Sequence, residues 1–519
     1  MTTSKNFRLT PLALSLLLLS SSNVWADNLT ISETWKMDGW SWNGSTQIFS
    51  NSNKNALIAD GASLKGNSST ATVNFTSSPK INIETEGSFI SNASLGSSGK
   101  QITYSVYNKI GTIKSGAIAF NLTKQGSQIV NLNDVEEVIA NNSSTDPSAG
   151  ARALSIIFTG GGNSSAPKAE QELGSFNLMT LRGTEAGKGF GIVLVDDATS
   201  SSNSCSQYLK TYITNVGTEE FPLDVGVLAQ FKDPGINIFP KGDQTLRHVG
   251  TIYATEAGIV NLSGTGQSNQ WVSSVTDIFV DSSKALTPVP ILAGIAGEAK
   301  SRNGNSTDTS NIRVGQTVKV RNLISVEGSL AKSSEQPASN ISYIKDESQI
   351  NIRAGVLNRG GRQAIESISE NVSGVTIRVG TKSPDESINY AVLVYPLFSQ
   401  SVTTTSGQNG LSKGFSPTDT QLKGSFNVVN GDVAVFGPQA RTAGEEHYLK
   451  VGNVSLTLNN TTRTTEDKQT VIVPSTLTLG GNSNLWVTNR SFDVYAGNGV
   501  ARAGENTIFS LSAGSGADA

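Results

Sequence analysis

The stretch "HVGTIYATEAGIVNLSGTG", His248–Gly266, decides the fold because its pattern recurs along the chain. The pattern is a glycine, a short spacer, a second glycine and a short apolar run. Three other stretches share it: "GTIKSGAIAFNL" from Gly111, "GTEAGKGFGIVLV" from Gly183 and "GTEEFPLDVGVLAQF" from Gly217. The first glycines of the last three copies, Gly183, Gly217 and Gly250, are 34 and 33 residues apart (217 − 183 and 250 − 217). Such regular spacing indicates a repeat architecture.

The apolar run after the second glycine supplies two columns of equivalent positions. Alternate residues of a strand share one face, so each column predicts side chains that stack from copy to copy. The second position holds Ile118, Val193, Leu228 and Val260, and the fourth holds Phe120, Val195, Gln230 and Leu262. We therefore expect Val193, Leu228 and Val260 to lie in one column, with Val260 and Leu262 pointing inward.

Each repeat is too small to bury its own apolar face, so neighbouring repeats must stack into one continuous core. The first glycine suits a turn that needs a positive φ, and the second permits close packing at the corner into the strand. The sequence thus predicts an all-β chain that forms a parallel β-helix or a related β-solenoid, with loop insertions.

Composition agrees with an exported, turn-rich β-protein. Residues 1–26 have the charged, apolar and small-residue order of a signal peptide, cleaved after Ala26, and no later stretch is apolar enough for a spanning helix. Glycine accounts for 52 of 519 residues, and the net charge of −3 argues against a nucleic-acid partner. The single cysteine, Cys205, excludes an intrachain disulfide and is expected to be an exposed thiol in a polar loop.

Breaks in the apolar pattern divide the chain into segments. We expect a signal peptide at 1–26, an N-terminal cap with the first coils at 27–100, solenoid repeats at 101–286, an irregular insertion with a helical turn or two at 287–311, further coils at 312–398, an exposed loop at 399–420, C-terminal coils at 421–510 and a disordered tail at 511–519.

The repeats resemble the passenger regions of bacterial type V autotransporters. The resemblance is carried by "HVGTIYATEAGIVNLSG", "KNALIADGASLKGNSSTATVNF", "FNVVNGDVAVFG" and "STLTLGGNSNLWVTNRSFDVYAG" and spans about two thirds of the chain. It implies a right-handed β-helix displayed on the outer membrane, with roles in adhesion, colonisation and virulence. Nothing after Val451 has the strand pattern of a membrane barrel, so either the barrel lies in another chain, or this is a shortened passenger, or the resemblance is one of architecture alone.

No catalytic, cofactor-binding or metal-binding set emerges from the sequence. The two histidines, His248 and His447, form no metal motif, and His248 is expected to be a bystander at a surface or corner. "GLSKG" (410–414) lacks the strand and helix of a nucleophile elbow, and "GTEAGKG" (183–189) lacks phosphate-loop spacing.

Two pairs of adjacent carboxylates, Asp196-Asp197 and Glu136-Glu137, suit solvated turns better than an acid/base couple. Neither pair is therefore predicted to be catalytic.

Three tryptophans, Trp35, Trp40 and Trp42, cluster near the mature N-terminus. Their rings suit a cap over the open end of the solenoid, which we favour, or a contact surface for sugars.

We expect a non-enzymatic surface protein whose partner is a host-surface or extracellular-matrix glycan or protein. The alternatives are a polysaccharide-cleaving β-helix enzyme and a fimbrial or matrix subunit built of β-sandwiches.

Overall fold

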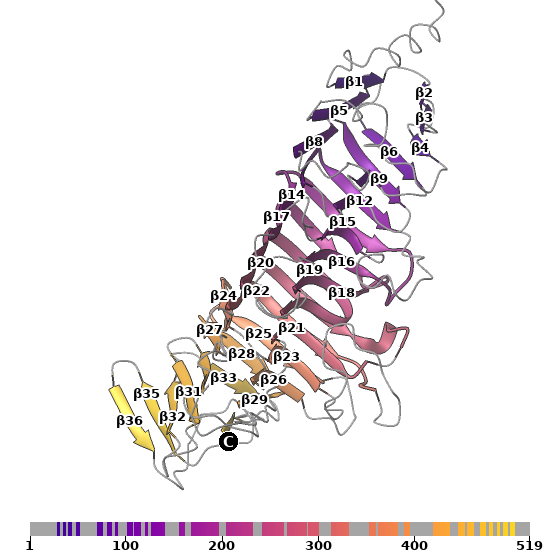
Figure 1. Cartoon of the computed structure of the whole chain (residues 1–519). Coiled ribbons are helices and arrows are strands. Elements are labelled where there is room, and N and C mark those ends of the chain that lie inside the picture. The colour runs from indigo at the N-terminus through magenta and orange to yellow at the C-terminus, as the bar shows by residue number, and fades with distance from the viewer. Residues whose placement is uncertain are drawn as a thin grey trace, which may run out of the picture.

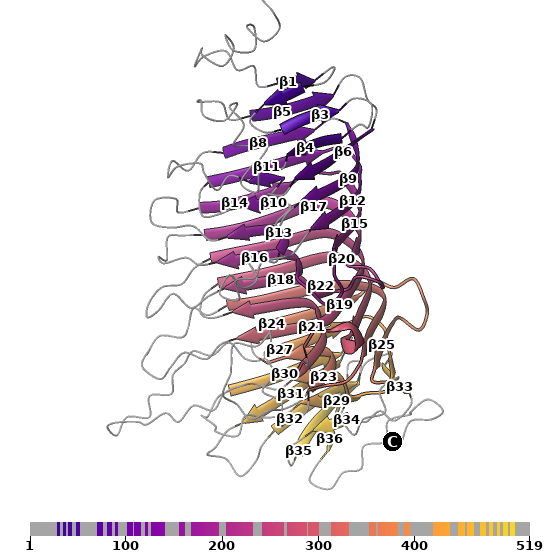
Figure 2. The ribbon, with the colours of Figure 1, turned by 90° about the vertical axis from the view of Figure 1, so that its right-hand side faces the viewer.

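The chain folds as an elongated parallel β-solenoid in the computed structural model (Figures 1 and 2). The structure describes residues 80–431 apart from 86–88, 92–100, 107, 116–119, 123–125, 141–154, 161–167, 197–203, 232–240, 264–266, 288, 300–312, 332–351, 360–361, 382–388 and 395–418; beyond that range it describes the strands given below. Strand makes up 78% of this part of the chain, which confirms the all-β prediction.

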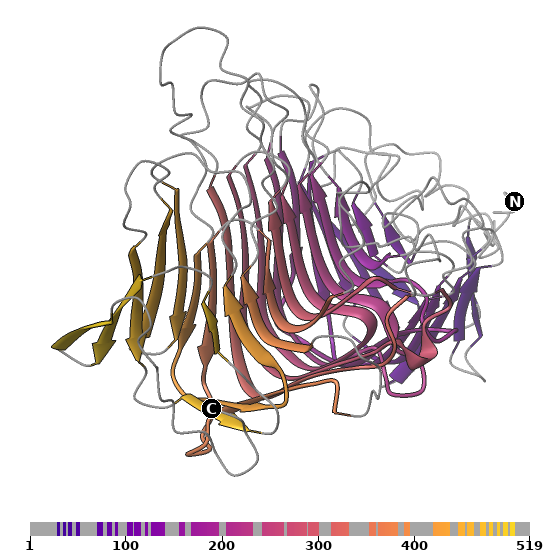
Figure 3. The same ribbon diagram turned by 90° about the horizontal axis from the view of Figure 1, so that it is seen from below.

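Three faces run along the solenoid, and each is a ladder of parallel strands. Viewed from below, the strands of a face lie one behind another (Figure 3). The first face stacks β1 (Asn28–Ile31), β5 (Thr70–Phe75), β8 (Gln101–Val106), β11 (Gly126–Leu132), β14 (Lys168–Leu173), the N-terminal parts of β17 (Ser204–Val216), β19 (Lys241–Ser263), β20 (Gln267–Asp281) and β22 (Arg313–Glu327), then β24 (Arg362–Ser367), β27 (Asp419–Lys423) and β30 (Glu445–Val451).

The second and third faces complete each coil. The second stacks β4 (Ile48–Asn51), β6 (Lys80–Thr85), β9 (Lys109–Ser115), β12 (Val135–Ala140), β15 (Asn177–Gly183), later parts of β17, β19, β20 and β22, then β25 (Val375–Val379), β28 (Phe426–Val429) and β33 (Leu477–Gly480). The third stacks β7 (Ile90–Ser91), β10 (Phe120–Leu122), β13 (Ser155–Gly160), β16 (Phe190–Asp196), β18 (Leu223–Phe231), the end of β19, β21 (Ile291–Ala299), β23 (Ile352–Asn358), β26 (Asn389–Val394), β29 (Asp432–Val435) and β34 (Leu485–Val487).

Antiparallel pairs occur near both ends. At the N-terminal end β2 (Trp35–Met37) and β3 (Trp40–Asn43) form a hairpin that pairs with β4. At the other end β31 (Val454–Asn460), β32 (Lys468–Val473), β35 (Ser491–Ala496) and β36 (Gly499–Ala503) mix antiparallel and parallel pairing. A 3₁₀ turn, η2 (Ser282–Lys284), follows β20.

The predicted column on the third face is confirmed. Val193 pairs with Leu228, and Leu228 pairs with Val260. The predicted inward direction of these side chains is wrong, however. Ile192, Val227 and Ile259 face the main core, whereas Val193, Leu228 and Val260 belong to a second buried cluster.

Adjacent residues of a strand point to opposite faces, so Val260 and Leu262 lie on the outer side of the third face, not inward. Both sides of this sheet are buried. Its strands therefore read as continuous apolar runs, as is typical of parallel strands buried on both faces.

The second glycine of the repeat marks a corner, as predicted. Gly191, Gly226, Gly258, Gly294 and Gly355 stack where the chain bends from the second face into the third. A Cβ at Gly258 would clash with Cγ2 of Ile278 and lie 2.6 Å from the Gly294 carbonyl oxygen. Only glycine lets the backbone approach the second face this closely.

The role assigned to the first glycine is wrong in three of the four copies. Gly217 has a φ of +74°, but Gly111, Gly183 and Gly250 lie within strands and have no positive φ. The first glycines also do not stack on one another, because Gly250 packs against Thr214, three residues before Gly217.

Two alignments of the first repeat also change. Phe120 pairs with Ile157, which pairs with Ile192, so Phe120 does not share a column with Val195. Ile118 lies outside the described residues.

Two further expectations are wrong. The small residues Ile291–Ala299 form β21, not an irregular segment with helical turns, because alanine and glycine pack where the third face is buried on both sides. Cys205 is fully buried in β17 beside Leu194 and Ala229, because the parallel register places it on the inner side of the first face.

A ladder of seven buried glutamines runs along the inner side of the first face, within the solenoid. They are Gln128, Gln171, Gln207, Gln244, Gln270, Gln316 and Gln363. Each amide nitrogen from Gln171 onward donates to the preceding glutamine's side-chain oxygen, at 2.7–2.9 Å, and to a backbone carbonyl of the third face. The hydroxyl of Thr420 donates to Gln363 at 3.3 Å and ends the ladder.

Candidate binding surface

Exposed aromatic side chains stand on the outer side of the first face. Tyr208 in β17 and Trp271 in β20 are 42% and 49% exposed. Each directly follows a ladder glutamine, so the alternation that buries Gln207 and Gln270 turns the two rings outward. Thr245 lies between them in the register, because Tyr208 pairs with Thr245 and Thr245 with Trp271.

A second cluster lies where the first face turns into the second. The Tyr212 ring, 38% exposed, lies 5.7 Å from the His248 ring, and the guanidinium of Arg247 sits 4.9 Å from the Tyr212 centroid. Register shifts between Leu209 and Tyr212, so the strand changes direction at this corner. The corner thus combines a ring with a cation held over it.

His248 is half-buried at this corner, in agreement with the predicted position. Burial, followed by the charge of Arg321, lowers the pKa of its imidazole. Nε of Arg321 donates to the Ser274 hydroxyl at 3.1 Å. Arg321 also lies 3.8 Å from the carboxylate of Glu370, which is 93% exposed.

The cations of this surface differ in how firmly they are paired. Lys210 contacts Glu172 at 2.6 Å, and Lys319 contacts Glu366 at 3.1 Å. Arg247 has no carboxylate partner among the residues that the structure describes, and its guanidinium lies over the Tyr212 ring. We call Tyr208, Tyr212, Arg247, Trp271 and Arg321 the aromatic–arginine strip.

The adjacent carboxylates Glu136 and Glu137 are not solvated turn residues, because both lie in β12. Glu136 pairs with Lys80 at 2.6 Å in an exposed contact. Glu137 accepts from Nε of Arg182, also at 2.6 Å, in a half-buried one. The two carboxylates thus make separate ion pairs with different partners.

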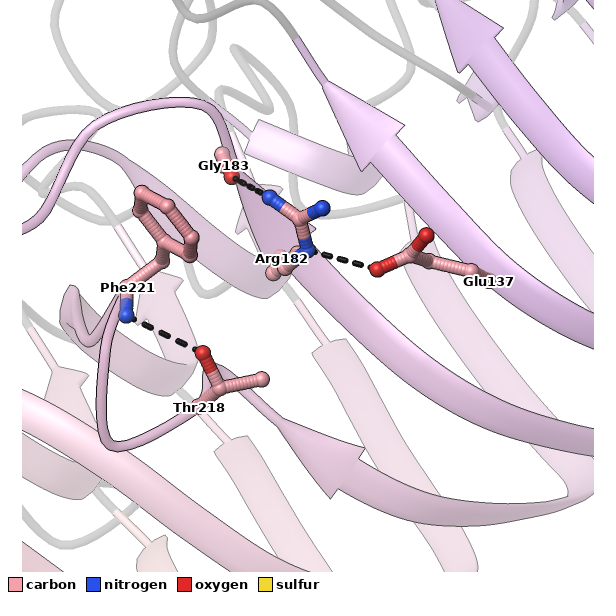
Figure 4. A network of polar contacts seen from close by, with 5 residues as sticks. All are labelled: Glu137, Arg182, Gly183, Thr218 and Phe221. Atoms are coloured by element: carbon pink, nitrogen blue, oxygen red, sulfur yellow. Dashed lines mark hydrogen bonds and ion pairs between the residues drawn. The ribbon is translucent and has the colours of Figure 1, made fainter.

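Arg182 joins a coil to the turn of the next one (Figure 4). Its guanidinium lies 4.7 Å from the Phe221 ring centroid and donates to the Gly183 carbonyl at 3.2 Å. The turn that carries Phe221 is closed by its own amide, which donates to the Thr218 hydroxyl at 3.0 Å. This network links β15 to the turn of the next coil.

A partly buried carboxylate lies at the turns between the second and third faces. Asp224 accepts from the Gly189 amide at 3.1 Å and from the Thr255 hydroxyl at 3.3 Å. Burial raises the pKa of Asp224 to about 6, against the opposing effect of these hydrogen bonds and of Lys188. Gly189, at the end of "GTEAGKG", has a φ of +91°. The glycine-rich segment thus supplies a hydrogen-bond donor to Asp224 at this corner.

The tryptophans of the predicted cap lie in the N-terminal hairpin. Trp35 is opposite Trp42, and Met37 is opposite Trp40, in the antiparallel pair β2–β3. The side chains of these tryptophans, and those of His447 and Asp196, lie outside what the structure describes. The same holds for all of Asp197, the signal peptide and the "GLSKG" segment.

The strip was missed by the sequence analysis, although a signal for it exists. Each ladder glutamine is followed by one outward residue and then an inward aliphatic residue, as in "QYL" and "QWV". Aligning these triplets would have placed Tyr208 and Trp271 in one exposed column.

Within the described ranges, no group of three or more His, Cys, Asp or Glu residues is arranged to hold a metal ion. No helix in the same part of the chain is long and apolar enough to cross a membrane. Comparisons with protein families, curated proteins and solved structures find no match to the chain.

Proposed function

We propose that the chain is an exported, surface-displayed β-solenoid that binds an extended ligand, in a role such as adhesion or colonisation. The autotransporter-like repeats and the predicted signal peptide support export and display. The observation that carries the binding role is the pair of exposed rings, Tyr208 and Trp271, on a regular parallel sheet.

The spacing of the rings favours an extended ligand. Neighbouring strands are about 4.8 Å apart, so Tyr208 and Trp271, two coils apart, are separated by about 10 Å along the stack. The hydrogen-bonded parallel strands hold this spacing fixed. Tyr and Trp offer large contact areas with few rotatable bonds. A polymer that lies along the solenoid can contact both rings.

The test compares adhesion of purified residues 27–519 to immobilised extracellular matrix and to cell surfaces. The triple variant Tyr208→Ala, Tyr212→Ala, Trp271→Ala should lose most of the adhesion. The control replaces exposed apolar residues elsewhere, Met179→Ala, Leu286→Ala and Val372→Ala, and should retain it. Adhesion that survives the aromatic substitutions would contradict the proposal, provided that both variants keep the wild-type circular dichroism spectrum.

A second candidate, polysaccharide cleavage, is favoured by Asp224. A carboxyl with a pKa of about 6 is suited to general acid–base catalysis near neutral pH. The test incubates the protein with a panel of acidic and neutral polysaccharides and measures newly formed reducing or unsaturated ends. Release that Asp224→Asn abolishes would support the enzyme over the binding scaffold.

A further inference from the structure

We propose that the aromatic–arginine strip binds a polysaccharide whose sugars carry carboxylate groups. This inference rests on the proposed binding function and names its ligand class. The strip joins exposed rings on the first face to two arginines at the neighbouring corner.

The rings supply the sugar-stacking part of the site. Tyr208 and Trp271 each combine an apolar ring face with a polar edge, which suits the CH-rich faces and the hydroxyls of pyranose rings. The residues beside Trp271 in the same column, Thr245 and Thr317, are small, so they leave the sides of its ring open. Lys210 lies 5.2 Å from the Tyr208 centroid and extends the polar border of the column.

The arginines supply the charge recognition. A planar guanidinium pairs with a carboxylate through two parallel hydrogen bonds, and Arg247 has no such partner in the described part of the chain. Arg321 holds Glu370 at 3.8 Å, and because that carboxylate is 93% exposed the pair is weak. A ligand carboxylate can replace Glu370 at little energetic loss.

Two lysines on the described part of this surface, Lys210 and Lys319, are engaged by carboxylates. Lys210 and Lys319 contact Glu172 and Glu366 at 2.6 and 3.1 Å. Among the described cations beside the strip, the ones left without a close carboxylate are therefore Arg247 and Arg321, at the corner beside Tyr212. A broad polyanion site, such as one for nucleic acid, would need a basic stripe, which these ion pairs neutralise.

The experiment measures binding of residues 27–519 to polygalacturonate, alginate and hyaluronate, each beside the same polymer after its carboxyl groups have been reduced to alcohols. Affinity electrophoresis and calorimetry report the dissociation constants. We expect at least one polyuronate to bind, and its reduced form to bind about tenfold more weakly, as the loss of a charged hydrogen bond predicts.

Two variants separate the contributions. Arg247→Gln with Arg321→Gln should weaken binding of the polyuronate by about tenfold or more and leave the reduced polymer unaffected. Tyr208→Ala with Trp271→Ala should weaken both forms. Lys80→Gln with Lys114→Gln, an equal charge change on exposed cations of the second face, is the control and should change neither.

Equal affinity for the acidic and reduced polymers, or full binding by the double arginine variant, would overturn the inference. Binding of no polyuronate, combined with adhesion that depends on the aromatic residues, would reject the ligand class and leave the proposed function standing. Adhesion that does not depend on the aromatic residues would reject both.

Discussion

The side-chain amide of Gln244 donates to the side-chain oxygen of Gln207 at 2.8 Å, one coil earlier in the solenoid. The same nitrogen donates to the Leu228 carbonyl of the third face at 3.1 Å. One buried side chain thus joins two coils along the stack and two faces across the interior. Fully satisfied buried polar networks of this kind fix a unique packing register.

Gln244→Leu should destabilise the protein strongly. The substitution leaves the side-chain oxygen of Gln207 without its donor and the side-chain amide of Gln270 without this acceptor, and both groups are buried. Each unsatisfied buried group costs about 1–3 kcal/mol, so we expect a loss of about 2–5 kcal/mol in the free energy of unfolding, measured with urea.

The matched control for this prediction is Gln230→Leu. Gln230 is half-buried and lies outside the ladder, on the third face. Its replacement should change the free energy of unfolding by less than about 1 kcal/mol. Similar losses for the two variants would mean that the ladder has no special role.

Gly258→Ala should also destabilise, whereas Gly297→Ala should not. The new methyl group at 258 would clash with Ile278 and the Gly294 carbonyl, so the corner must shift, at about 1–3 kcal/mol. At Gly297 the nearest atoms are 3.4–3.9 Å away, which is ordinary contact. Thermal unfolding followed by circular dichroism compares the two, and an equal effect would reject the corner argument.

Arg182→Lys should lower the free energy of unfolding by about 1 kcal/mol. Lysine keeps the charge but loses the guanidinium plane, which donates to Glu137 and covers the Phe221 ring. The exposed pair Lys80–Glu136 offers the comparison: Lys80→Met should change stability by less than about 0.5 kcal/mol. Calorimetry in low and high salt tests both, and equal losses would contradict the role of the network in Figure 4.

Asp224→Asn should stabilise the protein more at pH 7.5 than at pH 4.5. Burial raises the pKa of Asp224 from 3.8 to about 6, so the folded state binds the extra proton between these values. The contribution of this carboxyl to stability is therefore complete below about pH 4 and is lost as the pH rises through about 6. Asparagine stays neutral, and the gain at pH 7.5 should reach up to about 3 kcal/mol.

Urea denaturation at both pH values measures this effect. Glu185→Gln, an exposed carboxylate in the neighbouring turn, is the control and should show no such pH dependence. A difference between wild type and Asp224→Asn that is the same at pH 4.5 and pH 7.5 would show that Asp224 does not titrate in this range.

The repeated apolar columns were predictable from sequence because they follow from strand alternation alone. Val193, Leu228 and Val260 pair as expected. Their direction was not predictable, since a run that is apolar at every position fits either side of a sheet. Only the separation of Ile259 from Val260 into different clusters shows that this sheet is buried on both sides.

The glutamine ladder escaped the sequence analysis because its spacing is irregular. Successive members are 43, 36, 37, 26, 46 and 47 residues apart. The strands of successive coils pair in a fixed register, whereas the loops between the strands differ in length from coil to coil. A search for a repeat of constant period therefore does not detect the ladder. Cys205 was misplaced for a related reason, because a polar local sequence conceals a residue that the register of β14 and β17 turns inward.

The glutamine ladder also has a polarity. From Gln171 to Gln363 every amide nitrogen points toward the N-terminal neighbour and every side-chain oxygen toward the C-terminal one. A partly assembled stack therefore ends in an open acceptor on one side and an open donor on the other. When the stack grows from its N-terminal coil, each new glutamine donates its side-chain amide to the side-chain oxygen of the glutamine before it. The two ends of a half-formed solenoid therefore differ chemically, as the two ends of a polar filament do.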